Sequence, residues 1–312
     1  MSNQDTIAAA GGVELIVSLL EPKKFEQHKP KAGLGYGSGG ASILESEQDA
    51  MANLREDEDG SGEHHLIQKE LASALWSLSF ENGANQAKIA QAGGISLLVS
   101  LISDHPDIHR NAAGALWSLA ADEKNRITIA AEGGIPQLVE LLKTGSQNLA
   151  QESAAGALRT LAMNPTNRSK IADSGGIPNL IQLFDGGSEM AKTEVTGAIL
   201  ALAFENTSNQ FIIMSRLTKV LEAGPPDASQ AQNERELQRV EVQEHAVHAI
   251  YLLTKDREVR EAMSRTPVII QLVRELKAGS AKSQKISAEA LVQTARMSAT
   301  LRMQVTSQLV GL

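Results

Sequence analysis

Histidine and carboxylate side chains occur in two short groups with the spacing of metal ligands on a helix. Imidazole nitrogens and carboxylate oxygens bind Zn²⁺ when three or four of them converge on one point. Neither group has an evident fourth ligand, and two or three such residues share an exposed helix face by chance. We therefore interpret them as solvated surface residues. The groups are His105, Asp107 and His109, and Glu241, His245 and His248.

A glycine-rich segment, GYGSGG at Gly35–Gly40, matches the GxGxxG pattern of dinucleotide-binding turns. Such a site needs a strand before the glycines and a helix N-terminus after them. Neither is predicted here, so the segment is interpreted as a linker. The sequence contains no GxSxG, HExxH or P-loop motif and no cysteine. We expect no catalysis, no cofactor and no metal.

Composition favours packed helices over a β-sandwich. Apolar residues make up 42% of the 312 residues but aromatic residues only 3%, so Ala, Leu, Ile and Val must build most of the core. The formal charge is −8, and no cluster of Lys and Arg predicts binding to nucleic acid. The longest apolar stretch, Ile95–Ile102, is far shorter than the roughly 20 residues that span a bilayer. No secretory signal or lipidation motif is visible. We expect a cytoplasmic protein, and the nucleus is the alternative location.

A motif of the form GALW recurs along most of the chain. Its copies include GALW at Gly114–Trp117, GALR at Gly156–Arg159 and GAIL at Gly197–Leu200, in steps of about 41 residues. A second motif, GGIPxLVxLL, recurs with the same period and begins at Gly93, Gly133 and Gly175, with an earlier copy at Gly11. Self-similarity at this period indicates a solenoid, in which each unit buries its apolar face only against its neighbours. The third residues of the GALW copies are Leu75, Leu116, Leu158, Ile199, Ile250 and Leu291.

Each unit is predicted to contain three helices. In one unit these are Asn125–Gly133, Ile135–Leu142 and Asn148–Ala162. A glycine with positive φ ends the first helix, and small residues in the third helix allow neighbouring helices to approach closely. Five residues of the third helix fall at helical spacing on one apolar face: Leu149, Ala154, Ala157, Leu158 and Leu161.

These motifs resemble those of the armadillo-repeat family. The resemblance covers residues 1–22 and 66–312 and is specific in the three units of 66–185. It implies an all-α fold, a right-handed superhelical solenoid of armadillo-type three-helix repeats with some HEAT-like character after residue 189. We expect five segments: 1–22, a first partial repeat; 23–65, an acidic Gly/Ser-rich insertion, largely disordered; 66–224, armadillo repeats; 225–235, a polar insertion; and 236–312, degenerate armadillo or HEAT-like repeats and the C-terminal end.

The resemblance also implies a concave groove, lined by the third helices, that binds a protein or peptide. We call the fourth residue of each GALW copy the Trp position. In family members such as importin-α and β-catenin, an Asn four residues after the Trp position clamps the peptide backbone. Here Phe80, Ala121, Met163 and Phe204 stand at those places, so an importin-like clamp is not expected. The candidate partner-binding residues are Lys69, Ser73, Trp76, Phe80, Arg110, Gly114, Trp117, Glu152, Arg159, Met163, Leu200, Phe204, His248 and Tyr251.

The predicted function is a non-enzymatic scaffold or adaptor that binds a peptide or amphipathic helix along the groove. The alternatives are a transport receptor for cargo peptides and a structural component of a cytoskeletal or membrane-attached assembly, without membrane insertion. The chain starts at a first helix and ends soon after a third helix. We expect these ends to be either cut from a longer array or unusual caps, whose apolar faces favour self-association.

The acidic insertion has two interpretations beyond a solvated loop. Residues 41–63 contain eight acidic residues and one arginine, and apolar residues between Ile43 and Leu54 share one helical face. This segment is either a decayed repeat helix or a segment that competes with partners for the groove.

The competing segment gives a direct prediction. Deleting Lys31–Gly62 removes the competitor, so the chain should bind its groove partner more tightly, which titration calorimetry of both forms would measure. Equal affinity for the two forms would rule out competition.

Overall fold

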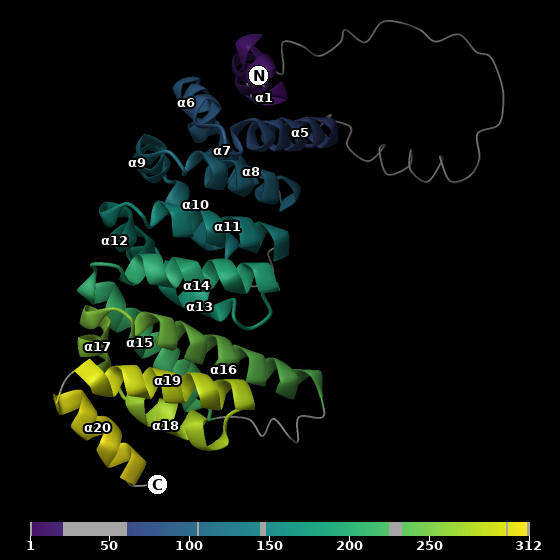
Figure 1. The fold of residues 1–312 in the computed structure, drawn as a ribbon. Helices are drawn as coiled ribbons and strands as arrows, with labels where there is room; N and C mark the ends of the chain where they lie inside the picture. The colour runs from purple at the N-terminus through teal and green to yellow at the C-terminus, as the bar shows by residue number, and fades with distance from the viewer. Residues whose placement is uncertain are drawn as a thin grey trace, which may run out of the picture.

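Three sets of helices stack along the molecule. The computed structural model describes residues 2–20, 61–104, 106–143, 148–224, 233–297 and 299–310, and all regular secondary structure in these ranges is helical. The third helices lie one below another on the near side of Figure 1, with the first helices along one edge and the second helices behind. The right-handed armadillo-type solenoid predicted from the sequence is confirmed. None of the described helices is long and apolar enough to cross a bilayer.

The helices follow the predicted order of the units. The first helices are α1 (Asn3–Ala9), α6 (Gly83–Gln91), α9 (Glu123–Ala131), α12 (Pro165–Asp173) and α17 (Arg257–Ser264). The second helices are α2 (Gly12–Leu20), α7 (Gly94–Asp104), α10 (Gly134–Leu141), α13 (Gly176–Gln182) and α18 (Val268–Ala278). The third helices are α5 (Ser61–Ser79), α8 (Pro106–Leu119), α11 (Asn148–Leu161), α14 (Glu189–Ala203), α16 (Glu234–Leu253) and α19 (Ala281–Met297).

Two further helices depart from the three-helix unit. Helix α15 (Thr207–Glu222) is one continuous helix where a first and a second helix would stand, and α20 (Ala299–Val310) follows the last third helix. Helix α5 begins five residues before the predicted Leu66. Most of the predicted acidic insertion (23–65), with the proposed competing segment, and most of the predicted polar insertion (225–235) lie outside the described residues, whereas 61–65 belong to α5.

The Gly-Gly pair shapes the corner between the first and second helices. Gly133 has φ of 80°, in the left-handed region that favours glycine. A Cβ on Gly134 would lie 2.7 Å from the Ile129 side chain and 3.2 Å from Val99 in the preceding unit. The first glycine therefore permits the turn, and the second permits close packing both within the unit and onto its neighbour.

A buried asparagine near the start of α6, α9, α12 and α15 joins successive units. The Asn167 side-chain amide donates to the Leu161 carbonyl at the end of α11, at 3.2 Å, and to the Arg126 carbonyl in the preceding unit, at 3.1 Å. Asn125 and Asn209 make equivalent pairs of bonds at 3.0–3.4 Å. Carbonyls at helix ends have no partner within the helix, so these amides both cap the third helices and tie the units together.

The residue after each of these asparagines supports the same helix end. Arg168 donates through Nε to the Ala162 carbonyl at 2.9 Å and through Nη1 to the Phe204 carbonyl in the next unit at 2.8 Å. Arg126 and Gln210 donate to the Ala120 and Ala203 carbonyls. The first helices thus hold the C-terminal ends of the third helices in a fixed row.

One predicted core residue is wrong. Ala154, Ala157, Leu158 and Leu161 are fully buried, as expected, but the Leu149 side chain is 47% exposed. Leu149 lies in the first turn of α11, but it is nine residues before Leu158 and therefore about 180° around the helix from it. The adjacent Ala150 is fully buried, so Leu149 is exposed because it faces away from the packed side of α11.

The paired hydrogen bonds of Asn167 lead to a stability prediction. Asn167→Ala leaves two carbonyls without their donor, one of them buried, so it should lower the free energy of unfolding by about 1–3 kcal/mol. Urea denaturation followed by circular dichroism measures the change. Asn179→Ala is the matched control, because Asn179 is not seen to make a side-chain hydrogen bond within the described part of the chain. Equal losses in both variants would contradict the structural role of Asn167.

A buried carboxylate lies between two helices of the last unit, α18 and α19. Glu275 on α18 is 1% exposed, and neither of its oxygens accepts a hydrogen bond within the described residues. Burial raises the pKa of Glu275 to about 7, and the nearby Ser283 hydroxyl on α19 offsets this only in part. The neutral acid is therefore the form that fits between α18 and α19.

Stability should consequently fall as the pH rises. The unfolded Glu275 ionises near 4.5 and the folded one near 7, so the contribution of Glu275 to stability is greatest below pH 4.5 and declines up to about pH 7. The full loss is on the order of 3 kcal/mol. Glu275→Gln should remove this slope in denaturation measured between pH 4.5 and 8, whereas Glu222→Gln, at an exposed site, should keep it. A slope unchanged in Glu275→Gln would refute the assignment.

Candidate functional site

The exposed surface of the stacked third helices is the candidate site, and we call it the ladder face. It runs across α5, α8, α11, α14, α16 and α19, which lie side by side (Figure 1). Residues seven and three before the Trp position and four after it fall on one side of a helix. The candidate residues predicted from the sequence therefore come together on this face.

Each glycine of the GALW motif lies under a large side chain of the preceding unit. A Cβ on Gly114 would be 2.7 Å from the Trp76 indole, and one on Gly156 would be 2.5 Å from that of Trp117. A Cβ on Gly197 would lie 2.7 Å from Arg159 Nε. The two indoles thus lie flat over glycine backbone, half-buried, with the rest of each ring facing solvent.

The residues four positions after the Trp position are exposed. Phe80, Met163 and Phe204 are 56%, 58% and 51% exposed. These side chains therefore do not pack between helices. Exposed aromatic and thioether side chains at a fixed repeat form a periodic apolar row, which is uncommon on a surface that contacts only water.

A second apolar row was not predicted from the sequence. Ten residues before the Trp position, Leu66, Leu149 and Met190 are 57%, 47% and 57% exposed. Ten residues place a side chain about 80° from the Trp position, on the same side of the helix. Aligning the repeats at this offset gives the signal, because Leu, Leu and Met recur there. The ladder face is thus bordered by apolar rows at both ends of its helices.

An apolar hollow lies between the two tryptophans. It has a volume of about 270 Å³ and is lined by Trp76, Phe80, Trp117, Ala121 and Thr160 together with neighbouring polar atoms. Its walls are the indoles and the exposed Phe80 ring. A hollow of this size and lining accommodates an apolar side chain of a partner.

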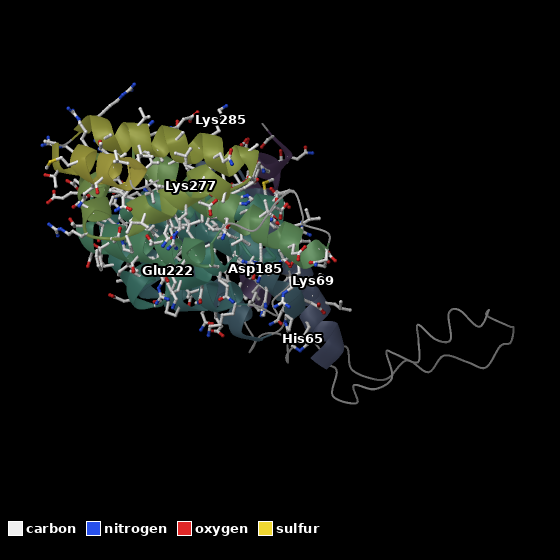
Figure 2. All side chains as sticks on the ribbon, turned by 90° about the horizontal axis from the view of Figure 1, so that it is seen from below. His65, Lys69, Asp185, Glu222, Lys277 and Lys285 are labelled. Carbon is white, nitrogen blue, oxygen red and sulfur yellow. The ribbon has the colours of Figure 1, made fainter. Side chains whose placement is uncertain are left out.

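Basic groups lie close to the aromatic residues. The Arg110 guanidinium lies 5.8 Å from the Trp76 ring and that of Arg168 lies 5.1 Å from the Phe204 ring, distances typical of cation–π contacts. Arg159 pairs with Glu194 at 3.1 Å. Charged side chains cover the outside of the stack, as Figure 2 shows, with Lys69 at one end and Lys285 at the other.

The remaining candidates are largely engaged within the protein. Glu152 accepts a hydrogen bond from Ser188 at 3.3 Å. The His248 ring stacks on Tyr251 with centroids 6.5 Å apart, and burial, assisted by the Lys282 charge, lowers the pKa of His248. Ser73, Lys69 and Leu200 are half-buried on the same face.

The two histidine groups were weighed from the sequence as metal ligands. No three His, Cys, Asp or Glu side chains converge to hold a metal within the described ranges, and His105 lies outside them. The interpretation of these residues as solvated is wrong for His245, whose side chain is 18% exposed and stacks on Phe184 with centroids 5.5 Å apart. Glu241 pairs with Lys192 at 3.0 Å and so joins α16 to α14.

The arrangement defines a helical-repeat protein with a surface suited to binding other proteins, and comparison with known proteins is consistent with this class. The Armadillo/beta-catenin-like repeat family matches residues 84–121 and 122–163. Each match spans one three-helix unit, α6–α8 and then α9–α11. The predicted resemblance is confirmed: the chain carries armadillo repeats.

Relatives share only short segments with this chain. It is similar to catenin delta-2 of Homo sapiens, 42% identical over 82 residues, which are 25% of this chain and 7% of the relative. The splicing regulator ARVCF of Homo sapiens is 37% identical over 90 residues, 28% of this chain and 9% of that protein. Protein ARABIDILLO 2 of Arabidopsis thaliana is 51% identical over 55 residues, 17% of this chain and 6% of that protein. The matches thus span less than a tenth of the relatives' length.

Solved structures share the fold. The crystal structure of an engineered protein has a TM-score of 0.62 and 23% identity, with 98% of this chain and 63% of that chain covered. A designed armadillo repeat protein in complex with the peptide (KR)4 has a TM-score of 0.53 and 22% identity, with 78% and 98% covered. At these identities the likeness shows the armadillo fold alone.

Proposed function

We propose that this protein is a non-enzymatic scaffold that binds an amphipathic helix of a partner protein along the ladder face. The observation that carries the proposal is the pair of apolar rows, Phe80, Met163 and Phe204 on one side and Leu66, Leu149 and Met190 on the other. Removing such side chains from water is favourable by roughly 25 cal/mol per Å² of apolar area.

The geometry favours a helix over an extended peptide. An extended strand needs regular hydrogen-bonding groups to hold its backbone. Phe80, Ala121, Met163 and Phe204 supply no side-chain amide where the resembled peptide-binding members carry Asn. A helix makes its own backbone hydrogen bonds, so it needs only apolar anchor sites on the partner surface. The hollow between Trp76 and Trp117 provides one such site.

The transport-receptor alternative has one specific observation in its favour. A designed armadillo repeat protein of similar fold binds the basic peptide (KR)4. In this chain, however, Glu244 pairs with Lys282 at 3.0 Å, and Glu152 accepts a hydrogen bond from Ser188. Fewer carboxylates are therefore free to receive basic cargo. For location we propose the cytoplasm, with the nucleus open, since a chain without cysteine suits a reducing compartment.

The apolar row gives the test of the proposal. The triple variant Phe80→Ser, Met163→Ser and Phe204→Ser should lose at least tenfold in affinity for the partner, because anchor side chains carry most of the binding energy. The three side chains are exposed, so helicity and unfolding should change little. Affinity purification from the native cell identifies the partner, and calorimetry with the purified partner measures both forms.

The matched control also replaces three exposed apolar side chains, but they lie away from the ladder face, one on α9 and two on α15. Ile127, Phe211 and Ile212 are 55%, 48% and 37% exposed, and their replacement by Ser should leave binding intact. If this control weakens binding as much as the triple variant, the ladder face is not the site. Labelled (KR)4 peptide, tested by fluorescence anisotropy, distinguishes the alternative: tight binding that survives the triple variant would favour a receptor for basic cargo.

A further inference from the structure

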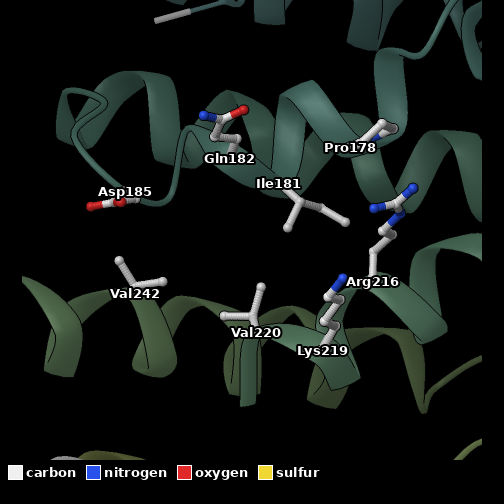
Figure 3. Close-up of a pocket in the computed structure, with 8 residues that line it drawn as sticks. All are labelled: Pro178, Ile181, Gln182, Asp185, Arg216, Lys219, Val220 and Val242. Atoms are coloured by element: carbon white, nitrogen blue, oxygen red, sulfur yellow. The ribbon is translucent and has the colours of Figure 1, made fainter. Parts of the chain in front are cut away.

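A second hollow lies away from the ladder face, between α13, α15 and α16. Figure 3 shows Ile181 of α13 facing Val220 of α15 and Val242 of α16 across it. Its volume is about 310 Å³. We call it the outer hollow. Val242 precedes Tyr251 by nine residues, or two and a half helical turns, so it lies on the side of α16 opposite the ladder face.

The outer hollow lies where the repeat pattern breaks. In regular units the second glycine of the pair packs onto a valine of the preceding second helix: Gly94 is 3.4 Å from Val17, and Gly176 is 3.3 Å from Val139, measured from an added Cβ. Ile181 occupies the equivalent place in α13. The unit that follows has no Gly-Gly pair, and its first two helices are merged in α15. In α15 the chain continues without this corner. The hollow lies beside Ile181, which is itself buried with 5% of its surface exposed, and Val220 and Val242 line it as half-buried side chains.

The two ends of the outer hollow carry opposite charges. Arg216 and Lys219 lie at one end and Asp185 at the other (Figure 3). All three are exposed, and in the part of the chain that the structure describes neither cation is seen in an ion pair. Between these ends the floor is formed by branched aliphatic side chains rather than aromatic ones, which suits Leu or Ile of a ligand.

An open hollow of this shape favours a peptide over a small molecule. Sites for small molecules bury most of the ligand surface, whereas here exposed side chains such as Arg216 and Asp185 leave the hollow open to solvent. A chain segment can place one or two side chains in the hollow while the rest of it remains outside. Opposite charges at the two ends would then fix its direction.

We propose that the outer hollow is a second docking site, which takes a short segment of another protein with an acidic residue, then aliphatic residues, then a basic residue. The acidic group lies at Arg216 and Lys219, the aliphatic side chains lie on Ile181, Val220 and Val242, and the basic group lies at Asp185. The site does not depend on the ladder face, so the scaffold would hold two partners on opposite sides.

The test uses the full chain and a defined probe, the blocked peptide Glu-Glu-Leu-Leu-Ser-Lys. Methyl NMR of the Ile- and Val-labelled protein should show shifts of the Ile181, Val220 and Val242 signals that saturate during titration. The double variant Arg216→Glu and Lys219→Glu should weaken the affinity at least tenfold, because it reverses the charge that receives the acidic end. The charge-reversed peptide Lys-Lys-Leu-Leu-Ser-Glu should bind more weakly to the unaltered protein.

The matched control is Lys277→Glu with Lys285→Glu, two exposed lysines on α18 and α19 (Figure 2) that change the net charge equally. This variant should bind the probe as the unaltered protein does. Absence of methyl shifts, or equal weakening in both double variants, would overturn the proposal. Signals that move on the ladder face instead, and vanish in the Phe80, Met163 and Phe204 variant, would also overturn it while leaving the proposed scaffold function in place.

Discussion

Close contact between third helices is the constraint on which the rest of this structure depends. Gly114 and Gly156 bring the backbone of one helix against the indole of the previous unit, at distances that no Cβ would allow. An indole placed over glycine is half-buried by backbone and still presents one side to solvent. The same contact that spaces the helices therefore also produces an aromatic surface. Stability and the proposed binding face arise here from one packing arrangement.

The apolar residues of the ladder face are compatible with the helix ends because buried side chains already bond the helix-end carbonyls. Asn125, Asn167 and Asn209, with their Gln and Arg neighbours, satisfy the carbonyls at the ends of the third helices from behind. The residue four positions after the Trp position then has no backbone group to cap, and Phe or Met there projects into solvent. In peptide-binding armadillo members an Asn at that place reaches outward to a ligand. In this chain the asparagines face inward and hold the units together.

The sequence predicted that Phe80, Met163 and Phe204 lie on the ladder face, but it did not predict the row of Leu66, Leu149 and Met190. It also predicted the repeat period and the three-helix unit, because these follow from local motifs with fixed spacing. The glycine corner at Gly133 is such a case, since its positive φ is required within a few residues. The exposure of individual side chains was less predictable from the sequence. Leu149 was expected on the buried face of α11 but is exposed, because it lies about 180° around the helix from Leu158. The buried asparagines were visible in the sequence as an Asn or Asp three residues before each one, yet their bonds to the preceding unit depend on the stacked geometry.

The loss of one motif shows how a repeat protein acquires features that its regular units lack. Where the Gly-Gly pair is absent, the corner straightens into α15, and the hollow beside Ile181 remains with charges at both ends. The adjoining junction between α14 and α16 is held differently from the regular ones, by the buried Lys192 bonded to Glu189 and Glu241 at 2.9 and 3.0 Å. A charged link tolerates an altered helix spacing better than interlocked glycine and indole do, because a lysine side chain can adjust its reach. The irregular unit therefore keeps the stack continuous and changes the surface on the side away from the ladder face.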